Sequence, residues 1–156
     1  MADIPFPAPM RLTARTVQGV HTEVWVQSFT DTIFIFVSQT GRVGSMISTT
    51  IDNQSLSSHG TAAGELAATT SKFLFGAGHE GSKKRELQLV YASHISQMIA
   101  HQNPAETRQV MLTISLQTPD RDLNISLSAD EEEQQRKQDR NLFENVIEMV
   151  NECSVW

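Results

Sequence analysis

Ile33-Phe34-Ile35-Phe36-Val37 is an unbroken run of β-branched and aromatic residues, and the rest of the chain is organised around it. Successive side chains along a strand point to opposite faces, so this run is apolar on both faces. It therefore predicts a central strand that is covered on each side. Gln39 to Gly44 and a second strand-like stretch, Ser45 to Thr49, follow it. Glycines at 41 and 44 around a short polar segment predict a hairpin between the two strands, with turn positions at positive φ.

Length and composition predict one folded domain with a substantial core. The chain has 156 residues, of which 39% are hydrophobic, and its net charge is -6 with a pI near 5.3. An acidic chain without clustered Lys and Arg is a poor candidate for nucleic-acid binding. No apolar run approaches the roughly 18 residues of a membrane span. A single cysteine, Cys153, and a proline-broken start without a signal-peptide pattern predict a reducing compartment, either the cytoplasm alone or the cytoplasm and the nucleus.

The N-terminal half predicts a mobile tail, a group of strands and a long loop. Residues 1–10 contain three of the five prolines and are expected to be mobile, whereas residues 11–156 are expected to form a single domain. Strands are predicted over 11–17 and 20–29, before the central strand. Residues 51–69 are rich in serine, glycine and alanine, which predicts a long loop that is disordered when unbound or carries function.

The C-terminal half predicts two strands and two helices. A strand is expected over 70–76, a loop over 77–85, a helix from Glu86 to the Asn103-Pro104 stop, and a strand over 108–118. Ser128 and Glu131 are expected to form a capping box at the start of the last helix, which is polar in its first half and amphipathic in its second. Most of the predicted strands come early in the chain and the helices come late. This order predicts the α+β class, with a mainly antiparallel sheet of about six strands and two main helices.

The chemically reactive residue types do not form a catalytic or metal-binding pattern. His94 and His101 fall on a helix face that also carries apolar residues, and Cys153 lies on the apolar stripe of the last helix. No histidine has a carboxylate or cysteine beside it at metal-ligand spacing. We therefore expect no cofactor, metal or catalytic residue. The basic trio Lys83-Lys84-Arg85 is expected to serve solubility, with an acidic protein partner as the alternative.

An ordered set of motifs resembles the proteasome assembly chaperone 3 family. Val17 to Val24 resembles the V-x-G-x-x-T-x-V start of that family, and Ile33 to Gln39 resembles its central apolar strand. Gln39 to Ser45 resembles its Q-x-G-K-x-G-T segment, with Arg42 where lysine is usual and serine in place of the last threonine. The C-terminal Cys153-Ser154-Val155-Trp156 is similar to its C-x-V-W terminus. The likeness covers residues 15–156, apart from the proline-rich start, a longer loop at 51–69 and a polar extension at 127–141.

This resemblance implies a chaperone without enzymatic activity. Members of the family pair with the related chaperone 4 as a heterodimer, or with themselves. The pair holds a proteasome α subunit, typically α5, helps the α-ring to close in the right order, and leaves as β subunits arrive. Such a protein needs a rigid sheet, an interface for its twin, and binding weak enough to be displaced.

The candidate protein-binding residues lie in three places. The segment containing Gln39, Gly41, Arg42 and Gly44 is a candidate surface for the proteasome or for the dimer partner. Ser55 and Ser58 represent the long loop, which could order on an α subunit. Trp156 is expected to pack against the sheet or a partner, and the alternative is that it covers the core of its own chain as a lid. Trp25 is either a rim residue of the core or an interface anchor.

Two other functional classes remain open at the level of sequence. A small enzyme or nucleotide-binding domain of the same layout would need a deep pocket with perturbed titratable groups. An interaction module of roadblock or longin type, working in trafficking or signalling, would share the α+β layout and differ in its partners.

Overall fold

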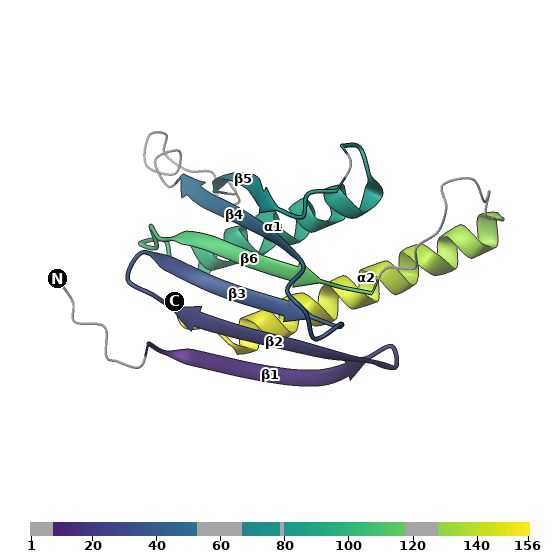
Figure 1. The fold of residues 1–156 in the computed structure, drawn as a ribbon, viewed down its shortest axis with the longest axis horizontal. Coiled ribbons are helices and arrows are strands. Elements are labelled where there is room, and N and C mark those ends of the chain that lie inside the picture. Colours follow the sequence, from purple (N-terminus) through teal and green to yellow (C-terminus); the bar gives the residue numbers. More distant parts are fainter. Residues whose placement is uncertain (1–7, 53–66, 79, 118–127) are drawn as a thin grey trace.

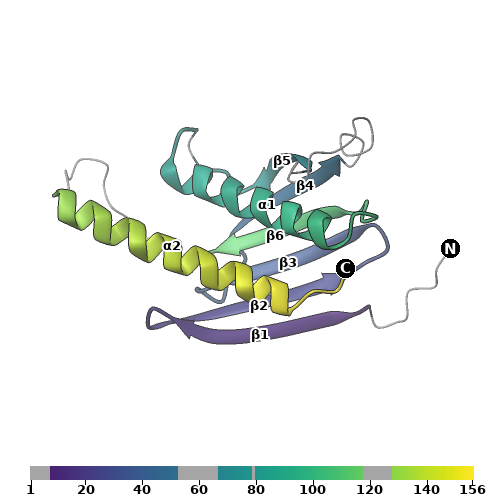
Figure 2. The ribbon, with the colours of Figure 1, turned by 180° about the vertical axis from the view of Figure 1, so that it is seen from behind.

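The computed structural model of the chain describes residues 8–52, 67–78, 80–117 and 128–156, and it contains one six-stranded sheet with two helices packed on one of its faces (Figures 1 and 2). The elements in chain order are β1 Met10–Val17, β2 Val20–Ser28, β3 Thr32–Ser38, β4 Ser45–Asp52, β5 Ala68–Phe75, α1 Lys83–Gln102, β6 Gln109–Ser115 and α2 Ala129–Glu152. The sheet is mainly antiparallel, as predicted, and the fold is α+β.

The strand order is β1-β2-β3-β6-β4-β5, so β3 and β6 are the two central strands. They pair in parallel, and every other neighbouring pair is antiparallel. Ile33, Ile35 and Val37 of β3 are fully buried beneath the helices beside Val110, Leu112 and Ile114 of β6. The most apolar pair of strands therefore lies in the middle of the core, where the helices remove it from water.

The predicted hairpin between the strand at 33–37 and the strand at 45–49 is wrong. β6 lies between β3 and β4 and pairs with both of them. Residues 39–44 are therefore a crossover that passes the end of β6. Local sequence favoured the hairpin because a short glycine-containing link usually joins neighbouring strands. The apolar β6 takes the inner position instead, because Val110, Leu112 and Ile114 are all buried in the core, whereas Ile47 is the one fully buried apolar side chain of β4.

The prediction that the central strand is covered on each side is wrong as well. Both helices lie on the same face of the sheet, as the front and back views agree (Figures 1 and 2). Phe34 and Phe36 point to the opposite face and are only half-buried. Within the part of the chain that the structure describes, no helix covers that second face, which we call the open face.

The ends of β1, β4 and β5 differ from the sequence prediction. β1 begins at Met10, and the carbonyl of Pro9 accepts a hydrogen bond from the Ser28 amide at 2.9 Å, so the end of the predicted 1–10 tail is attached to the sheet. β4 continues to Asp52 and β5 begins at Ala68, so the ends of the predicted 51–69 loop belong to paired strands. Residues 1–7 and 53–66 lie outside the described residues.

Helix α1 begins three residues earlier than predicted, because Ser82 caps it. The Ser82 side chain accepts the amide of Arg85 at 3.2 Å, which places the basic trio in the first helical turn and not in a loop. Val90 and His94 of α1 are exposed, whereas Tyr91, Ile95 and Ile99 are buried in the core.

Helix α2 agrees closely with its prediction. Ser128 and Glu131 form the expected capping box, and Val146, Val150 and Cys153 are buried against the sheet. The polar first half extends past the edge of the sheet layer (Figure 1). Within the described residues neither helix combines the length and apolarity that crossing a membrane would require.

Candidate protein-interaction surfaces

The open face of the sheet carries a continuous row of mostly apolar side chains. The strand register aligns Leu12, Trp25, Phe36, Thr113 and Met46 across five strands. The neighbouring row contains Phe34 and Met111, which are half-buried like Trp25 and Phe36. Half-buried aromatic side chains on a regular sheet surface are typical of protein interfaces. The geometry of this face therefore suits another apolar surface better than it suits water.

Trp25 is the centre of an aromatic cluster on the open face. Its ring centroid lies 5.2 Å from that of Phe34 and 5.3 Å from that of Phe36, the second pair being stacked. Such contacts hold the rings in place and add about 0.5–1.5 kcal/mol per pair beyond their buried area. Trp25 is therefore a rigid aromatic surface residue outside the helix-covered core, which favours the interface-anchor interpretation over the core-rim one.

Thr113 lies in the middle of the same row. Only 1% of this residue is exposed, and its hydroxyl has no hydrogen-bond partner in the described part of the chain. A buried hydroxyl without a partner is destabilising, so residues of this kind are uncommon. Phe36 and Met46 flank it on the neighbouring strands.

The predicted segment 39–44 is held firmly by internal hydrogen bonds. The Gln39 amide donates to the carbonyl of Ser115 at 2.8 Å, and its side-chain amide donates to the Thr22 hydroxyl at 3.0 Å. The Ser38 hydroxyl accepts the amides of Thr40 and Gly41, at 3.2 and 2.9 Å. The side chain of Gln39 is thus occupied in fastening the crossover to the sheet.

The tip of this crossover is exposed and carries a positive charge beside an apolar side chain. Arg42 is exposed, and Val43 is 60% exposed. Gly41 has a φ of 69°, as the sequence predicted, whereas Gly44 does not have a positive φ. Gly44 is needed for a different reason: a Cβ there would overlap the carbonyl oxygen of Ile114 and lie 2.8 Å from its carbonyl carbon. The crossover therefore presents a defined tip, with Gly44 packed on β6.

Trp156 packs on the core of its own chain. It is partly buried against the core cluster, and its indole N–H donates to the Gln102 side chain at 2.8 Å. Gln102 in turn donates to the side chain of Asn151 at 2.6 Å, so the end of α1 ties the chain terminus to α2. This position agrees with the lid interpretation. Ser55 and Ser58 lie outside the described residues, and all seven candidate residues stay predictions as regards partner binding.

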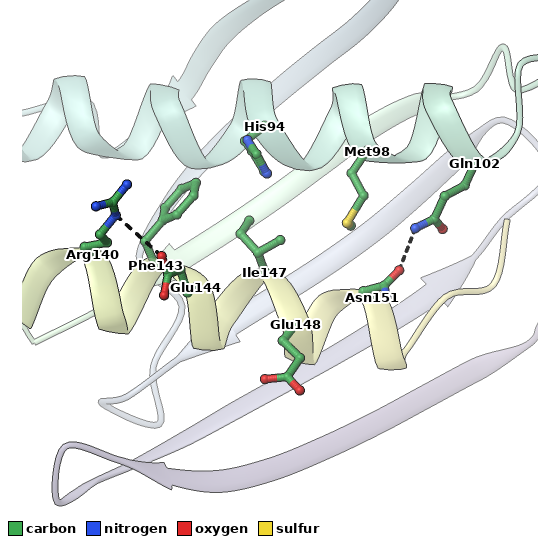
Figure 3. A pocket seen from close by; sticks show the side chains of 9 residues that line it. All are labelled: His94, Met98, Gln102, Arg140, Phe143, Glu144, Ile147, Glu148 and Asn151. Carbon is green, nitrogen blue, oxygen red and sulfur yellow. Dashed lines mark hydrogen bonds and ion pairs between the residues drawn. The ribbon is translucent and has the colours of Figure 1, made fainter.

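A groove of about 510 Å³ runs between the outer sides of α1 and α2 (Figure 3). Met98, Phe143 and Ile147 point into it, and Arg140 pairs with Glu144 on its rim at 3.5 Å. The residues that line it come from both helices: His94, Met98, Gln102, Arg140, Phe143, Glu144, Ile147, Glu148 and Asn151. Glu148 points away from the groove and pairs with Arg15 of β1 at 3.2 Å.

The titratable groups with displaced pKa values are structural. Hydrogen bonds from Arg108 lower the pKa of Glu106, a side chain that is 5% exposed. Arg108 also donates to the Ser28 hydroxyl and the Phe29 carbonyl, so the pair fastens the β2–β3 turn to the start of β6. Burial raises the pKa of Tyr91 and that of the Cys153 thiol. A raised pKa keeps a thiol protonated and unreactive, so Cys153 behaves as a small core residue.

Metal ligands do not gather anywhere in residues 8–52, 67–78, 80–117 and 128–156. His94 is exposed and meets Phe143 edge-on, with ring centroids 5.1 Å apart. His21 hydrogen-bonds Glu23 at 2.9 Å on the strand surface. The chemistry that these surfaces offer is the binding of polypeptide through apolar and charged contacts.

The comparisons with known proteins agree with this picture of a binding protein. The model of the family described as "Proteasome assembly chaperone 3" matches residues 35–153. A search of the curated proteins found no match. Among solved structures, the chain resembles one from "Crystal Structure of a Novel Chaperone Complex for Yeast 20S Proteasome Assembly", with a TM-score of 0.53 at 9% identity over 92% of this chain and 97% of the other.

The fold and its open face define an α+β binding scaffold, and the family match makes the class more specific. The chain belongs to the proteasome assembly chaperone 3 family, because the family model covers most of its length. The resemblance inferred from the ordered motifs is thereby confirmed. At 9% identity the structural likeness supports the fold alone.

Sequence analysis missed the open face as an interaction surface. The signal was present in the run Ile33 to Val37, which is apolar on both faces. One further consideration would have found it: in the α+β class, helices are segregated to one face of an antiparallel sheet, so the other face is left without helices. Phe34, Phe36 and Trp25 then require a cover from outside the described chain.

Proposed function

We propose that this chain is a non-catalytic chaperone of 20S proteasome assembly that pairs with a chaperone 4-like subunit. The pair holds an α subunit of the α5 type and promotes formation of the α-ring. The observation that carries the proposal is an aromatic sheet face that no helix covers within the described residues, in a member of the proteasome assembly chaperone 3 family. A chain that acts by holding other polypeptides needs surfaces and does not need a reactive centre.

The open face supports pairing with a subunit of the same fold. Two sheets pack face to face at about 10 Å, with the side chains of their inner faces interdigitated. Trp25, Phe34, Phe36 and Met111 form a flat apolar surface of the kind that such packing requires. We assign this face to the chaperone 4-like partner, and a second copy of this chain is the alternative occupant that the first experiment distinguishes.

The crossover tip supports the contact with the α subunit. Arg42 and Val43 are exposed on a segment whose backbone is fixed by the hydrogen bonds of Ser38 and Gln39. A preorganised tip loses little conformational entropy on binding. A small contact surface of this kind also gives an affinity low enough for the chaperone to be displaced when β subunits arrive.

Pairing is tested by mixing the purified chain with its cognate chaperone 4-like protein and measuring mass in solution. Trp25→Ala should weaken the heterodimer by roughly 30-fold, which corresponds to about 2 kcal/mol for a central aromatic anchor. Val90→Ala is the matched control, because it also removes an exposed apolar side chain but lies on the outer side of α1. Equal affinities for both variants would contradict the assignment of the open face, and a stable homodimer alone would assign the face to a second copy.

The assembly role is tested in cells by deleting the gene and resolving 20S precursors on native gels. Accumulation of incomplete α-ring intermediates is expected, with rescue by the wild-type chain and weaker rescue by Trp25→Ala. Pulldown of an α subunit supports the proposal. Normal intermediates together with pulldown of GTPases or coat proteins would favour the trafficking module instead.

A further inference from the structure

The outer edge of β5 is a second unpaired surface of the sheet, distinct from the open face. β5 spans Ala68–Phe75 and pairs only with β4 among the strands that the structure describes. An edge strand presents a row of backbone N–H and C=O groups that can pair with another chain. Leu74 and Phe75 at its end are 47% and 49% exposed. This edge therefore offers backbone hydrogen bonds together with apolar contact area.

The opposite edge, β1, differs because Arg15, one of its two arginines, is already engaged. Arg15 forms ion pairs with Glu148 and Glu152 of α2, and the Thr13 hydroxyl also meets Glu152. Helix α2 thus packs against β1 and pairs with Arg15 within the chain. No comparable set of carboxylates faces the cations around β5 in the described residues.

Four cations surround β5 on both sides of the sheet. Lys72 is on the open face, because the register aligns it with Ser48 and, beyond that, with Met111. On the helix side, the guanidinium of Arg85 lies 4.9 Å from the centre of the Phe73 ring, and Lys83 and Lys84 share its helical turn. None of the four is ion-paired within the described part of the chain.

The local charge is opposite in sign to that of the whole protein. Residues 72–86 contain these four cations and two carboxylates, Glu80 and Glu86, a local net charge of +2 (4 − 2), whereas the chain carries -6. The N-terminus of α1 adds the positive end of a helix dipole at the same place. An acidic ligand is therefore attracted to this end of the sheet and repelled from the rest of the molecule.

From these observations we infer that the β5 edge binds an extended acidic segment of a partner polypeptide by strand addition. The side chains of an added strand alternate between the two faces. In a segment that alternates acidic and apolar residues, the carboxylates then share one face and meet the cations in the first turn of α1, and the apolar residues on the other face contact Phe75, which is aligned with Met46 on the open face. The backbone groups of the edge lie in the plane of the sheet, so a subunit stacked on the open face leaves them accessible. The inference is thus independent of the proposed pairing.

A synthetic peptide tests the inference directly. The probe is a fluorescein-labelled peptide of alternating glutamate and valine, about ten residues long so that it spans the edge strand. The full-length protein should bind it with an affinity that falls as salt increases, and a lysine–valine peptide of the same length should not bind. Two further probes carry N-methyl groups on the glutamate or on the valine nitrogens. Because an added strand pairs through one set of nitrogens only, one of the two should lose binding and the other should retain most of it.

Protein variants locate the site. Lys83→Glu with Lys84→Glu should weaken binding of the glutamate–valine probe by about tenfold, because the change reverses two of the charges that attract it. These changes also place acidic residues in the first turn of α1, where they are compatible with folding. Arg136→Glu with Lys137→Glu is the matched control on the exposed part of α2 and should leave binding unchanged apart from a small effect of net charge.

Hydrogen exchange completes the test, because bound probe should slow amide exchange in Ala68–Phe75 and leave Met10–Val17 unaffected. Protection of β1 in place of β5, equal binding of both N-methylated probes, or equal loss in the two double variants would each overturn the inference. Failure of the probe to bind would do so as well, whereas heterodimer formation would remain a separate measurement.

Discussion

Gly44→Ala should destabilise this protein much more than Gly41→Ala, and the difference tests the crossover between β3 and β4. The two glycines look equivalent in sequence, since they flank the same short polar segment. In the structure, Gly41 has a φ of 69° and nothing within 4 Å of the position that a Cβ would occupy. Gly44 has an ordinary φ, but a Cβ there would overlap the carbonyl oxygen of Ile114 and lie 2.8 Å from its carbonyl carbon.

The magnitudes follow from these two environments. At position 41 the cost is that of a left-handed conformation for an L-residue, about 1 kcal/mol. At position 44 the obstacle is the backbone of Ile114, which cannot rotate away. The start of β4, where Ser45 is aligned with Ile114, must therefore move away from β6. Overpacking costs about 1–3 kcal/mol, and a weakened ladder hydrogen bond adds about 1 kcal/mol. The free energy of unfolding should therefore fall by about 3 kcal/mol.

Urea denaturation of the two variants and the wild type measures this difference. An asparagine series is the control, because asparagine tolerates the left-handed conformation but not a steric clash. Gly41→Asn should therefore recover most of the loss seen with Gly41→Ala, whereas Gly44→Asn should be at least as destabilising as Gly44→Ala. If Gly44→Ala costs no more than Gly41→Ala, the segment does not pass against β6, and the strand order β3-β6-β4 is wrong.

Four further substitutions test other contacts. Arg108→Ala should lower the free energy of unfolding by about 3 kcal/mol, because it leaves the buried Glu106 carboxylate without its partner. Since Arg108 lowers the pKa of Glu106 in the folded state, the stabilisation from ionised Glu106 is present at neutral pH and is lost as pH falls below about 5. Glu106→Gln should therefore make the free energy of unfolding less dependent on pH in this acidic range. An unchanged dependence on pH would count against the ion pair. Thr113→Val should raise the melting temperature and increase the free energy of unfolding by up to about 1 kcal/mol, because it removes a buried hydroxyl that has no partner among the described residues. A loss of stability would mean that this hydroxyl is hydrogen-bonded in the native protein. Gln102→Ala should cost about 1 kcal/mol and speed exchange of the Trp156 indole proton measured by NMR, while unchanged exchange would contradict their hydrogen bond.

The local features of the fold were predictable from sequence because local interactions decide them. Ser128 and Glu131 form their capping box within one turn, and the alternation of Val110, Leu112 and Ile114 sets the buried face of β6 without reference to other strands. The start of α1 was missed because Lys83 and Lys84 are unfavourable near a helix N-terminus, and the Ser82 cap outweighs them.

The candidate site was predictable only in part. The motif at Gln39 to Gly44 indicated the family, and the structure assigns its residues separate tasks: Gln39 fastens the crossover, Gly44 packs on β6, and Arg42 is exposed. The open face was hidden because a run that is apolar on both faces does not reveal which face its own chain covers. The β5 edge was hidden because the basic trio was placed in a loop, away from any strand.

The sequence alone determined the α+β class and the number of elements, since periodicity and capping act over a few residues. Strand order, the crossover and the bare second face were decided only by tertiary structure. Their cause is competition between whole strands for burial: β6 takes the centre beside β3 because Val110, Leu112 and Ile114 bury more apolar surface there than β4 could. Because both helices pack on that core (Figure 2), Trp25 and Phe36, which are aligned and half-buried, lie on the face of the sheet that no described helix covers.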